Sequence, residues 1–131
     1  MATRSLIGLT KEDGTIQVIY CHWDGYPSGV GLQLALNYND VETIQKLMDL
    51  GDRSSLTGAP TADETYYATQ GNKIVPTIYD NFQQFVDNDK AGAEYFYLWS
   101  KGWTIYKVSH DDTVEPLGKI TDIKLTIELE A

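Results

Sequence analysis

The stretch ATRSLIGLTKEDGTIQVIYCH, residues 2–22, predicts a β-hairpin. Ala2–Leu9 alternates in the manner of a strand, and Thr15–His22 has a second strand pattern. Asp13-Gly14 between them is a strong two-residue turn signal. Both faces of the second strand are rather apolar, so we expect this strand to lie centrally in a sheet.

The middle of the chain favours helices. Val30–Asn37 is a short apolar stretch that fits a helix, and Asn39–Leu50 is a stronger candidate. Asn39 and Glu42 have the spacing of a capping box, and Gly51 fits the position after the last helical residue. The apolar positions recur at helical spacing, at Val41, Ile44, Leu47 and Met48.

The next segment, Asp52–Asn72, is polar and rich in glycine, proline and threonine, which predicts a long loop. Ile74–Pro76 fits a short extended piece. Thr77–Asp89 follows with a helical pattern in which Tyr79, Phe82 and Val86 share one side, and Thr77 is the expected N-cap.

The last third of the chain predicts a sheet. The three strand patterns are Glu94–Ser100, Trp103–His110 and Ile120–Leu129. Turn signals at Lys101-Gly102 and Asp111-Asp112 separate them. The order is therefore two strands, two or three helices and three strands. We expect one α+β domain over residues 1–131, with an antiparallel sheet and helices packed on one face.

Composition excludes several classes of protein. The 131 residues carry a net charge of −9, and the ten lysines and arginines are scattered, which argues against duplex nucleic acid as a partner. We find no apolar run of the roughly 20 residues that span a membrane, and Arg4 and the polar residues near it predict that the N-terminal stretch is not a secretory leader. Cys21 is the only cysteine. We therefore expect its side chain to be a small buried one, and we expect the protein to act in a reducing compartment, the cytoplasm.

The densest group of chemistry-bearing residues is IYCHWDGYPSGVG, residues 19–31. Gly29 and Gly31 follow a strand and precede a candidate helix, where backbone N–H groups can bind an anion. No Gly-Lys-Ser/Thr follows, which excludes a nucleotide-hydrolysing P-loop. The alternative is a turn whose glycines need positive φ.

Five side chains in or near this segment could contribute to a ligand site or to catalysis. Arg4 suits a phosphate, and the hairpin brings it to the end of the second strand, but it also suits an ion pair. His22 and Asp24 could act as a general base pair, although no nucleophile is evident and zinc spacings are absent. Trp23 and Tyr26 are aromatic surfaces on which a base can stack.

Aromatic residues are also dense near the predicted sheet end, at Tyr95, Tyr97, Trp99, Trp103 and Tyr106. Aromatics at strand spacing usually form a core, and an exposed excess would mark a subunit interface or a stacking surface. We therefore expect a homo-oligomer.

The segments TRSLIG (Thr3–Gly8) and DGTIQVIYCHWDGYPSGVG (Asp13–Gly31) resemble a family of small bacteriophage proteins that open with a Thr-Arg-Ser strand, an Asp-Gly turn and an IYCHWDGYP-like segment. The likeness covers about the first quarter of the chain and includes Arg4, His22, Trp23, Asp24 and Tyr26. It implies a phage accessory protein. By analogy with phage sponges, it implies sequestering of the nucleotide messengers of bacterial defence.

The leading hypothesis is a phage protein without enzymatic activity or cofactor, acting in the host cytoplasm. It would bind a nucleotide-like ligand, such as a cyclic nucleotide or an ADP-ribose derivative. The expected ligand-binding residues are Arg4, His22, Trp23, Asp24, Tyr26, Gly29 and Gly31. The alternatives are an acidic module that inhibits a host protein by mimicking nucleic acid, and a small hydrolase that uses His22 and Asp24.

Overall fold

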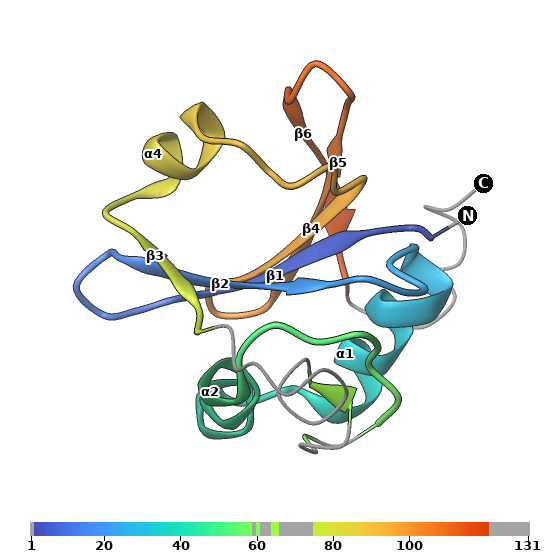
Figure 1. Cartoon of the computed structure of the whole chain (residues 1–131). Coiled ribbons are helices and arrows are strands. Elements are labelled where there is room, and N and C mark those ends of the chain that lie inside the picture. The colour runs from blue at the N-terminus through green and yellow to red at the C-terminus, as the bar shows by residue number, and fades with distance from the viewer. Residues whose placement is uncertain (1, 59, 61–63, 66–74, 121–131) are drawn as a thin grey trace.

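The computed structural model describes residues 2–58, 60, 64–65 and 75–120. The strands are β1 Ser5–Thr10, β2 Ile16–Cys21, β3 Thr77–Tyr79, β4 Tyr95–Trp99, β5 Trp103–Val108 and β6 Val114–Lys119. The helical elements are the π-helical turn η1 Pro27–Gly31, α1 Leu32–Asn37, α2 Val41–Leu50 and α4 Phe82–Asp87. The strands form one sheet in the order β3-β2-β1-β4-β5-β6 (Figure 1).

The predicted N-terminal hairpin is confirmed. β1 and β2 pair antiparallel from Ser5 opposite Cys21 to Thr10 opposite Ile16. Gly14 closes the turn at φ +88°, a conformation that glycine adopts without steric cost. β2 lies inside the sheet, between β1 and the short strand β3.

The sheet is mixed, so the expectation of an antiparallel sheet is wrong at one position. β1 pairs parallel with β4, from Ser5 opposite Tyr95 to Leu9 opposite Trp99. β1 is buried along Ser5–Leu9 and has neighbours on both sides, which suits a parallel pairing because parallel strands need cover on both faces.

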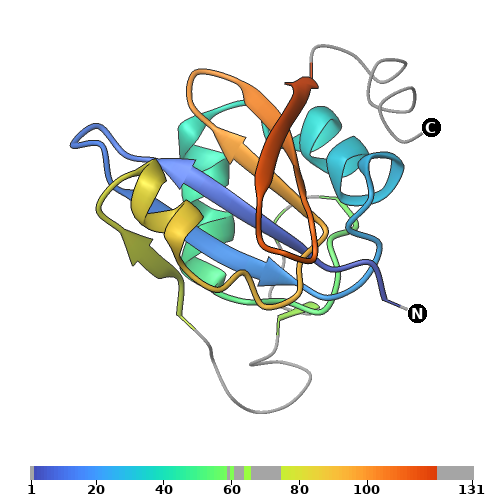
Figure 2. The ribbon, with the colours of Figure 1, turned by 90° about the horizontal axis from the view of Figure 1, so that it is seen from above.

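Helices cover both faces of the sheet, which corrects the expectation of helices on one face (Figures 1 and 2). α1 and α2 lie over the face that carries Ile7, Leu9, Ile19, Cys21 and Tyr97. α4 lies over the opposite face, where Phe85 stacks on Phe96 with ring centroids 4.1 Å apart. Gly8 leaves room for this cluster, since a Cβ there would stand 2.9 Å from the Phe96 ring.

The helix over residues 41–50 is confirmed, but its cap is one residue later than predicted. Asp40 is the N-cap and accepts a hydrogen bond from the Thr43 N–H at 2.7 Å. Asn39 instead donates to the Ala35 carbonyl. Val41 is 55% exposed and lies outside the buried face of the helix, which consists of Ile44, Leu47 and Met48. The predicted helix at 30–37 begins earlier, with η1.

The segment predicted as a helix over Thr77–Asp89 divides into β3 and α4. Thr77 lies in β3 and is not a cap, because Asn81 caps α4 by accepting from the Gln84 N–H at 2.9 Å. The last predicted strand lies mainly outside the described residues, from 121 onward. The strand observed after the Asp111-Asp112 turn is β6, which the sequence reading missed because Pro116 and Gly118 interrupt its alternation.

Candidate functional site

The backbone of residues 22–31 is a closed turn rather than an open anion cradle. Asp24 has φ +58°, and its carbonyl accepts from the Val30 N–H at 2.8 Å. The Gly29 N–H donates to the Tyr26 carbonyl at 2.9 Å, and Gly31 is buried inside η1. The Gly29 N–H that we expected to contact an anion is therefore engaged within the segment.

The glycines of this segment are needed for close approach. A Cβ on Gly29 would stand 2.2 Å from the Asp24 carbonyl oxygen. A Cβ on Gly25 would stand 2.7 Å from the Cβ of Ser5 and from the Thr3 carbonyl oxygen. Real Cβ atoms do not reach such distances, so both positions exclude a side chain.

The side chains of the segment bond mostly to one another. The Tyr20 hydroxyl lies 2.8 Å from His22 Nδ1, and the His22 ring meets the Trp23 ring edge-on at 4.7 Å. The Tyr26 hydroxyl donates to the Asp24 carboxylate at 3.0 Å. His22 and Asp24 thus bond to different tyrosines and share no hydrogen bond in the part of the chain that the structure describes.

Cys21 has the environment of a structural residue. Its side chain is fully buried, and this burial raises the pKa of the thiol to about 12. A thiol that stays protonated at neutral pH is neither a nucleophile nor a metal ligand.

The Arg4 guanidinium lies beside Gly92, three residues before β4 begins. The side chain is exposed, and its Nη1 lies 3.0 Å from the point where a Cβ on Gly92 would stand. The Arg4 carbonyl accepts from the Glu94 N–H at 2.9 Å. Among the described residues, Arg4 makes no hydrogen bond or cation–π contact with Trp23 or Tyr26.

A buried cluster that the sequence reading missed holds the end of β2. Arg53 is fully buried. Its backbone N–H donates to the Tyr20 carbonyl at 2.8 Å, and its side-chain Nε donates to the Ser55 carbonyl at 2.6 Å. Burial alone would raise the pKa of the Glu64 carboxyl, but hydrogen bonds from Ser55 and Thr57 and the charge of Arg53 hold it below its usual value. The sequence shows only a polar run here, because a buried arginine has no local periodic signal.

Asp52, next to that cluster, has a carboxyl group whose charged form is disfavoured by burial. Its carboxylate accepts from the Tyr20 N–H at 2.9 Å, yet partial burial raises its pKa to about 6. It lines a small cavity of about 120 Å³ together with Lys90. The Lys90 ammonium is nearly inaccessible and donates to the Val86 and Asn88 carbonyls at 2.5 and 2.7 Å, which fixes the loop after α4.

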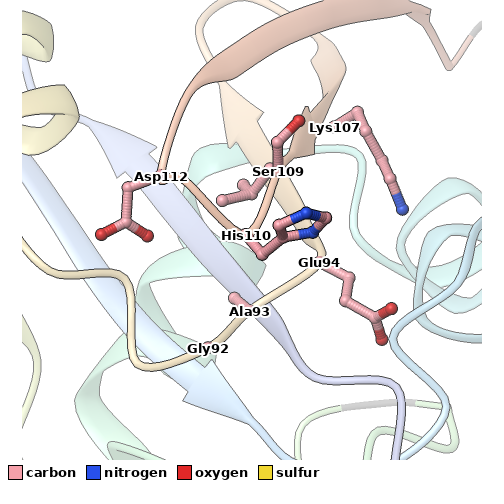
Figure 3. A pocket seen from close by; sticks show the side chains of 8 residues that line it. Gly92, Ala93, Glu94, Lys107, Ser109, His110 and Asp112 are labelled. Atoms are coloured by element: carbon pink, nitrogen blue, oxygen red, sulfur yellow. The ribbon is translucent and has the colours of Figure 1, made fainter.

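A larger cleft opens where β4 begins and the β5–β6 turn passes over it (Figure 3). Its volume is about 480 Å³. The lining residues are Gly92, Ala93, Glu94, Lys107, Val108, Ser109, His110 and Asp112. A cleft of this size lies within the range of small-molecule sites, about 300–1,000 Å³.

The turn over this cleft is well defined. Asp112 has φ +66° and its N–H donates to the Ser109 carbonyl at 2.8 Å. The Asp111 carboxylate accepts from the Thr113 N–H and hydroxyl at 3.2 and 2.8 Å, and these bonds lower the pKa of Asp111. The turn therefore positions His110 without using the His110 side chain.

Several polar side chains that line the cleft are free to bond to a ligand. In Figure 3 the His110 ring lies between Glu94 and Asp112, while Lys107 extends away from it. The Lys107 Nζ lies 4.3 Å from the centroid of the Tyr95 ring. Within the described ranges, the side chains of Glu94, His110 and Asp112 make no hydrogen bond or ion pair with the protein, so they can bond to a ligand. His110 was missed because a lone histidine in a turn has no sequence signal.

The described residues include no group of three His, Cys, Asp or Glu side chains placed to hold a metal ion. The described helices are also all too short or too polar to cross a bilayer. No family model, no curated protein and no solved structure matches the chain.

Proposed function

We propose that this protein binds a small nucleotide-derived signal without converting it, as a phage accessory protein that removes a host defence messenger from solution. The observation that carries this proposal is the cleft of about 480 Å³, in which the side chains of Glu94, His110 and Asp112 make no hydrogen bond or ion pair with the described residues. The resemblance of the first quarter of the chain to small phage proteins supplies the biological setting.

The lining favours a ligand with both anionic and hydroxyl or amino groups. His110 lines the cleft, and the Arg4 guanidinium lies beside the lining residue Gly92; both side chains can donate hydrogen bonds to a phosphate. Glu94 and Asp112 accept hydrogen bonds, which suits sugar hydroxyls or a base amino group. With a net charge of −9, the protein attracts no anion from a distance, so recognition depends on short-range contacts with these few groups.

Sequestering is a better explanation than hydrolysis. His22 and Asp24 bond to separate tyrosines, and the Cys21 thiol is buried with a raised pKa. General base catalysis needs a base within hydrogen-bond reach of a nucleophile or a positioned water. His22 and Asp24 therefore do not form the acid–base pair that the hydrolase alternative requires.

The test is thermal melting of the chain with a panel of 5′-mononucleotides, 3′,5′-cyclic mononucleotides and ADP-ribose, followed by chromatography of the recovered nucleotide. We expect one class to raise the melting temperature by several degrees, since a ligand at a hundred times its Kd adds about 2.7 kcal/mol. The nucleotide should be recovered intact. A protein that melts unchanged with every compound, or that releases a cleaved product, contradicts the proposal.

Variants locate the site. Arg4→Ala and His110→Ala should each remove most of the melting shift, because each loses a donor to the phosphate. Trp23→Ala is the matched control, since Trp23 is 48% exposed and lies outside the cleft. If Trp23→Ala abolishes the shift and the other two variants retain it, the ligand binds at residues 22–31 and the cleft assignment is wrong.

A further inference from the structure

A second cleft lies on the face of the sheet that α4 covers. In Figure 1, α4 and the β5–β6 hairpin rise from this face on opposite sides. The cleft between them, called here the Lys119 cleft, has a volume of about 400 Å³. The lining residues are Thr10, Gly14, Ile16, Phe82, Leu98, Ser100, Thr104, Tyr106 and Lys119. None of them lines the cleft at residues 92–112, so the two sites are separate.

Strand pairing explains why residues from distant parts of the chain line this cleft. Thr10 pairs with Ile16, and Thr104 pairs with both Leu98 and Lys119. Directly paired residues of neighbouring strands point to the same side of a sheet. Ile16 and Leu98 belong to the core on the α4 side, so their partners point to that side as well. The pairing therefore forms a row of side chains that runs from β2 to β6.

The polar lining of the Lys119 cleft consists of one ammonium and several hydroxyls. In the described part of the chain, no hydrogen bond or ion pair engages these side chains, namely Thr10, Ser100, Thr104, Tyr106 and Lys119. Burial raises the pKa of the Tyr106 hydroxyl, so this group stays protonated and can donate. The lining includes no Asp or Glu, whereas the cleft at residues 92–112 includes Glu94 and Asp112. The Lys119 cleft thus provides a cation without a competing carboxylate in its lining.

The rest of the lining is apolar. Ile16 and Leu98 are buried at the base of the cleft. The rings of Phe82 and Tyr106 lie beside them, with centroids 5.3 Å apart. Aromatic rings of this kind pack against other rings in offset or edge-on arrangements. A ligand therefore needs an apolar part for these residues and an anionic part for Lys119.

We propose that the Lys119 cleft binds a small organic anion that has one apolar ring and one carboxylate. The Lys119 ammonium pairs with the carboxylate, and the neighbouring hydroxyls donate to its remaining lone pairs. One lysine matches one negative charge, whereas a phosphate carries more charge than this lining balances. A sugar fits less well, because the lining has no carboxylate or amide side chain to bond to its hydroxyls.

The test uses 3-phenylpropionate as the probe and the neutral 3-phenylpropionamide as its matched control. In a nuclear magnetic resonance titration of the ¹⁵N-labelled chain, we expect saturable binding of 3-phenylpropionate in the millimolar range. The largest amide shifts should fall on Ser100 and Thr104. The amide compound should bind about tenfold more weakly, because it makes no charge-assisted bond with Lys119.

Variants test the role of the charge. Lys119→Met keeps an apolar side chain but removes the ammonium, so it should weaken binding of 3-phenylpropionate about tenfold, whereas Lys119→Arg should retain it. Lys46→Met removes the same charge from an exposed position on α2 and should leave binding unchanged. The proposal is overturned if the unmodified chain shows no saturable shifts, or if Lys119→Met binds the probe as tightly as Lys46→Met.

One further variant keeps this test separate from the proposed nucleotide site. His110→Ala should bind 3-phenylpropionate as the unmodified chain does, because His110 does not line the Lys119 cleft. Binding that His110→Ala removes and Lys119→Met retains would place the anion in the cleft at residues 92–112, which also overturns the proposal. The proposed nucleotide binding can fail without changing any of these results.

Discussion

Residues 19–31 and the cleft at residues 92–112 are both crowded with polar groups, but they use them differently. In the first region, Tyr20 bonds to His22, Tyr26 bonds to Asp24, and the Gly29 N–H bonds to a carbonyl of the same turn. In the second region, the side chains of Glu94 and His110 have no partner among the described residues, although hydrogen bonds fix the backbone at both residues' segments.

The difference separates a structural segment from a binding site. Polar groups that satisfy one another stabilise a turn but have little capacity left for a ligand. Polar groups that line an open cleft on a fixed backbone contribute little to folding and remain available for binding. Variants in the two regions should therefore differ in their effects on stability.

The largest effect is expected for Gly29→Ala. The added Cβ would stand 2.2 Å from the Asp24 carbonyl oxygen, so the turn must open, at about 3 kcal/mol of unfolding free energy. Gly14→Ala is the control. Gly14 has φ +88° but open space around it, so we expect only the conformational cost of about 1 kcal/mol. Urea unfolding of both variants measures the difference, and equal losses would contradict the close-packed turn.

Tyr97→Phe should have the next largest effect. The Tyr97 hydroxyl donates to the Gly25 carbonyl at 2.6 Å in a buried position, and this bond ties β4 to the turn. Its removal leaves a buried carbonyl without its donor, which costs about 1–2 kcal/mol. Tyr106→Phe provides the comparison, because Tyr106 lies in β5 on the opposite face of the sheet from Tyr97. A loss for Tyr97→Phe no larger than that for Tyr106→Phe would mean that the bond does not hold the turn.

Asp52→Asn should stabilise the protein at neutral pH. The folded pKa of Asp52, about 6, lies above the unfolded value of about 3.9, so the folded state favours the protonated form. The charged Asp52 carboxylate therefore destabilises the native state above pH 6, and this destabilisation disappears as the pH falls toward 4. The shift corresponds to about 3 kcal/mol at most, and we expect about 1 kcal/mol because the carboxyl is partly solvated.

The measurement is urea unfolding of Asp52→Asn and the unmodified chain from pH 4 to pH 8. The stability gain of the variant should be present at pH 8 and vanish near pH 4. Asparagine keeps the acceptor for the Tyr20 N–H, so the hydrogen bond is not lost. A gain that is the same at every pH would refute the assigned cause.

The smallest effects are expected in the cleft. Glu94→Gln and His110→Ala should each change the unfolding free energy by less than about 0.5 kcal/mol, because their side chains are exposed and have no partner among the described residues. Circular dichroism during urea unfolding is sufficient to measure this. A loss above 1 kcal/mol in either variant would place it among the structural residues.

Local patterns predicted the hairpins and α2 well. Asp13-Gly14 and Lys101-Gly102 mark turns in the sequence, and both turns are present. The parallel pairing of β1 with β4 was not predictable in this way, because it joins strands more than eighty residues apart. The spacing of Tyr79 and Phe82 fits a helix, but Tyr79 belongs to β3 because it pairs with Ile16 of β2.

The site was predicted less well, for a physical reason. Residues 22–31 attract attention because they are chemically dense, but density does not show whether groups bond to each other or to a ligand. Arg4 reaches the sheet end as predicted, yet its guanidinium lies beside Gly92, which only the pairing of β1 with β4 brings near.

The most direct test of the account is nuclear magnetic resonance of the ¹⁵N-labelled chain titrated to millimolar 3′,5′-cyclic AMP and, separately, ADP-ribose. If the cleft is the binding site, the largest amide shifts should fall on Gly92, Ser109 and His110, with Gly29 and Gly31 unchanged. Shifts concentrated on Gly29 and Gly31, or none with either compound, would contradict it.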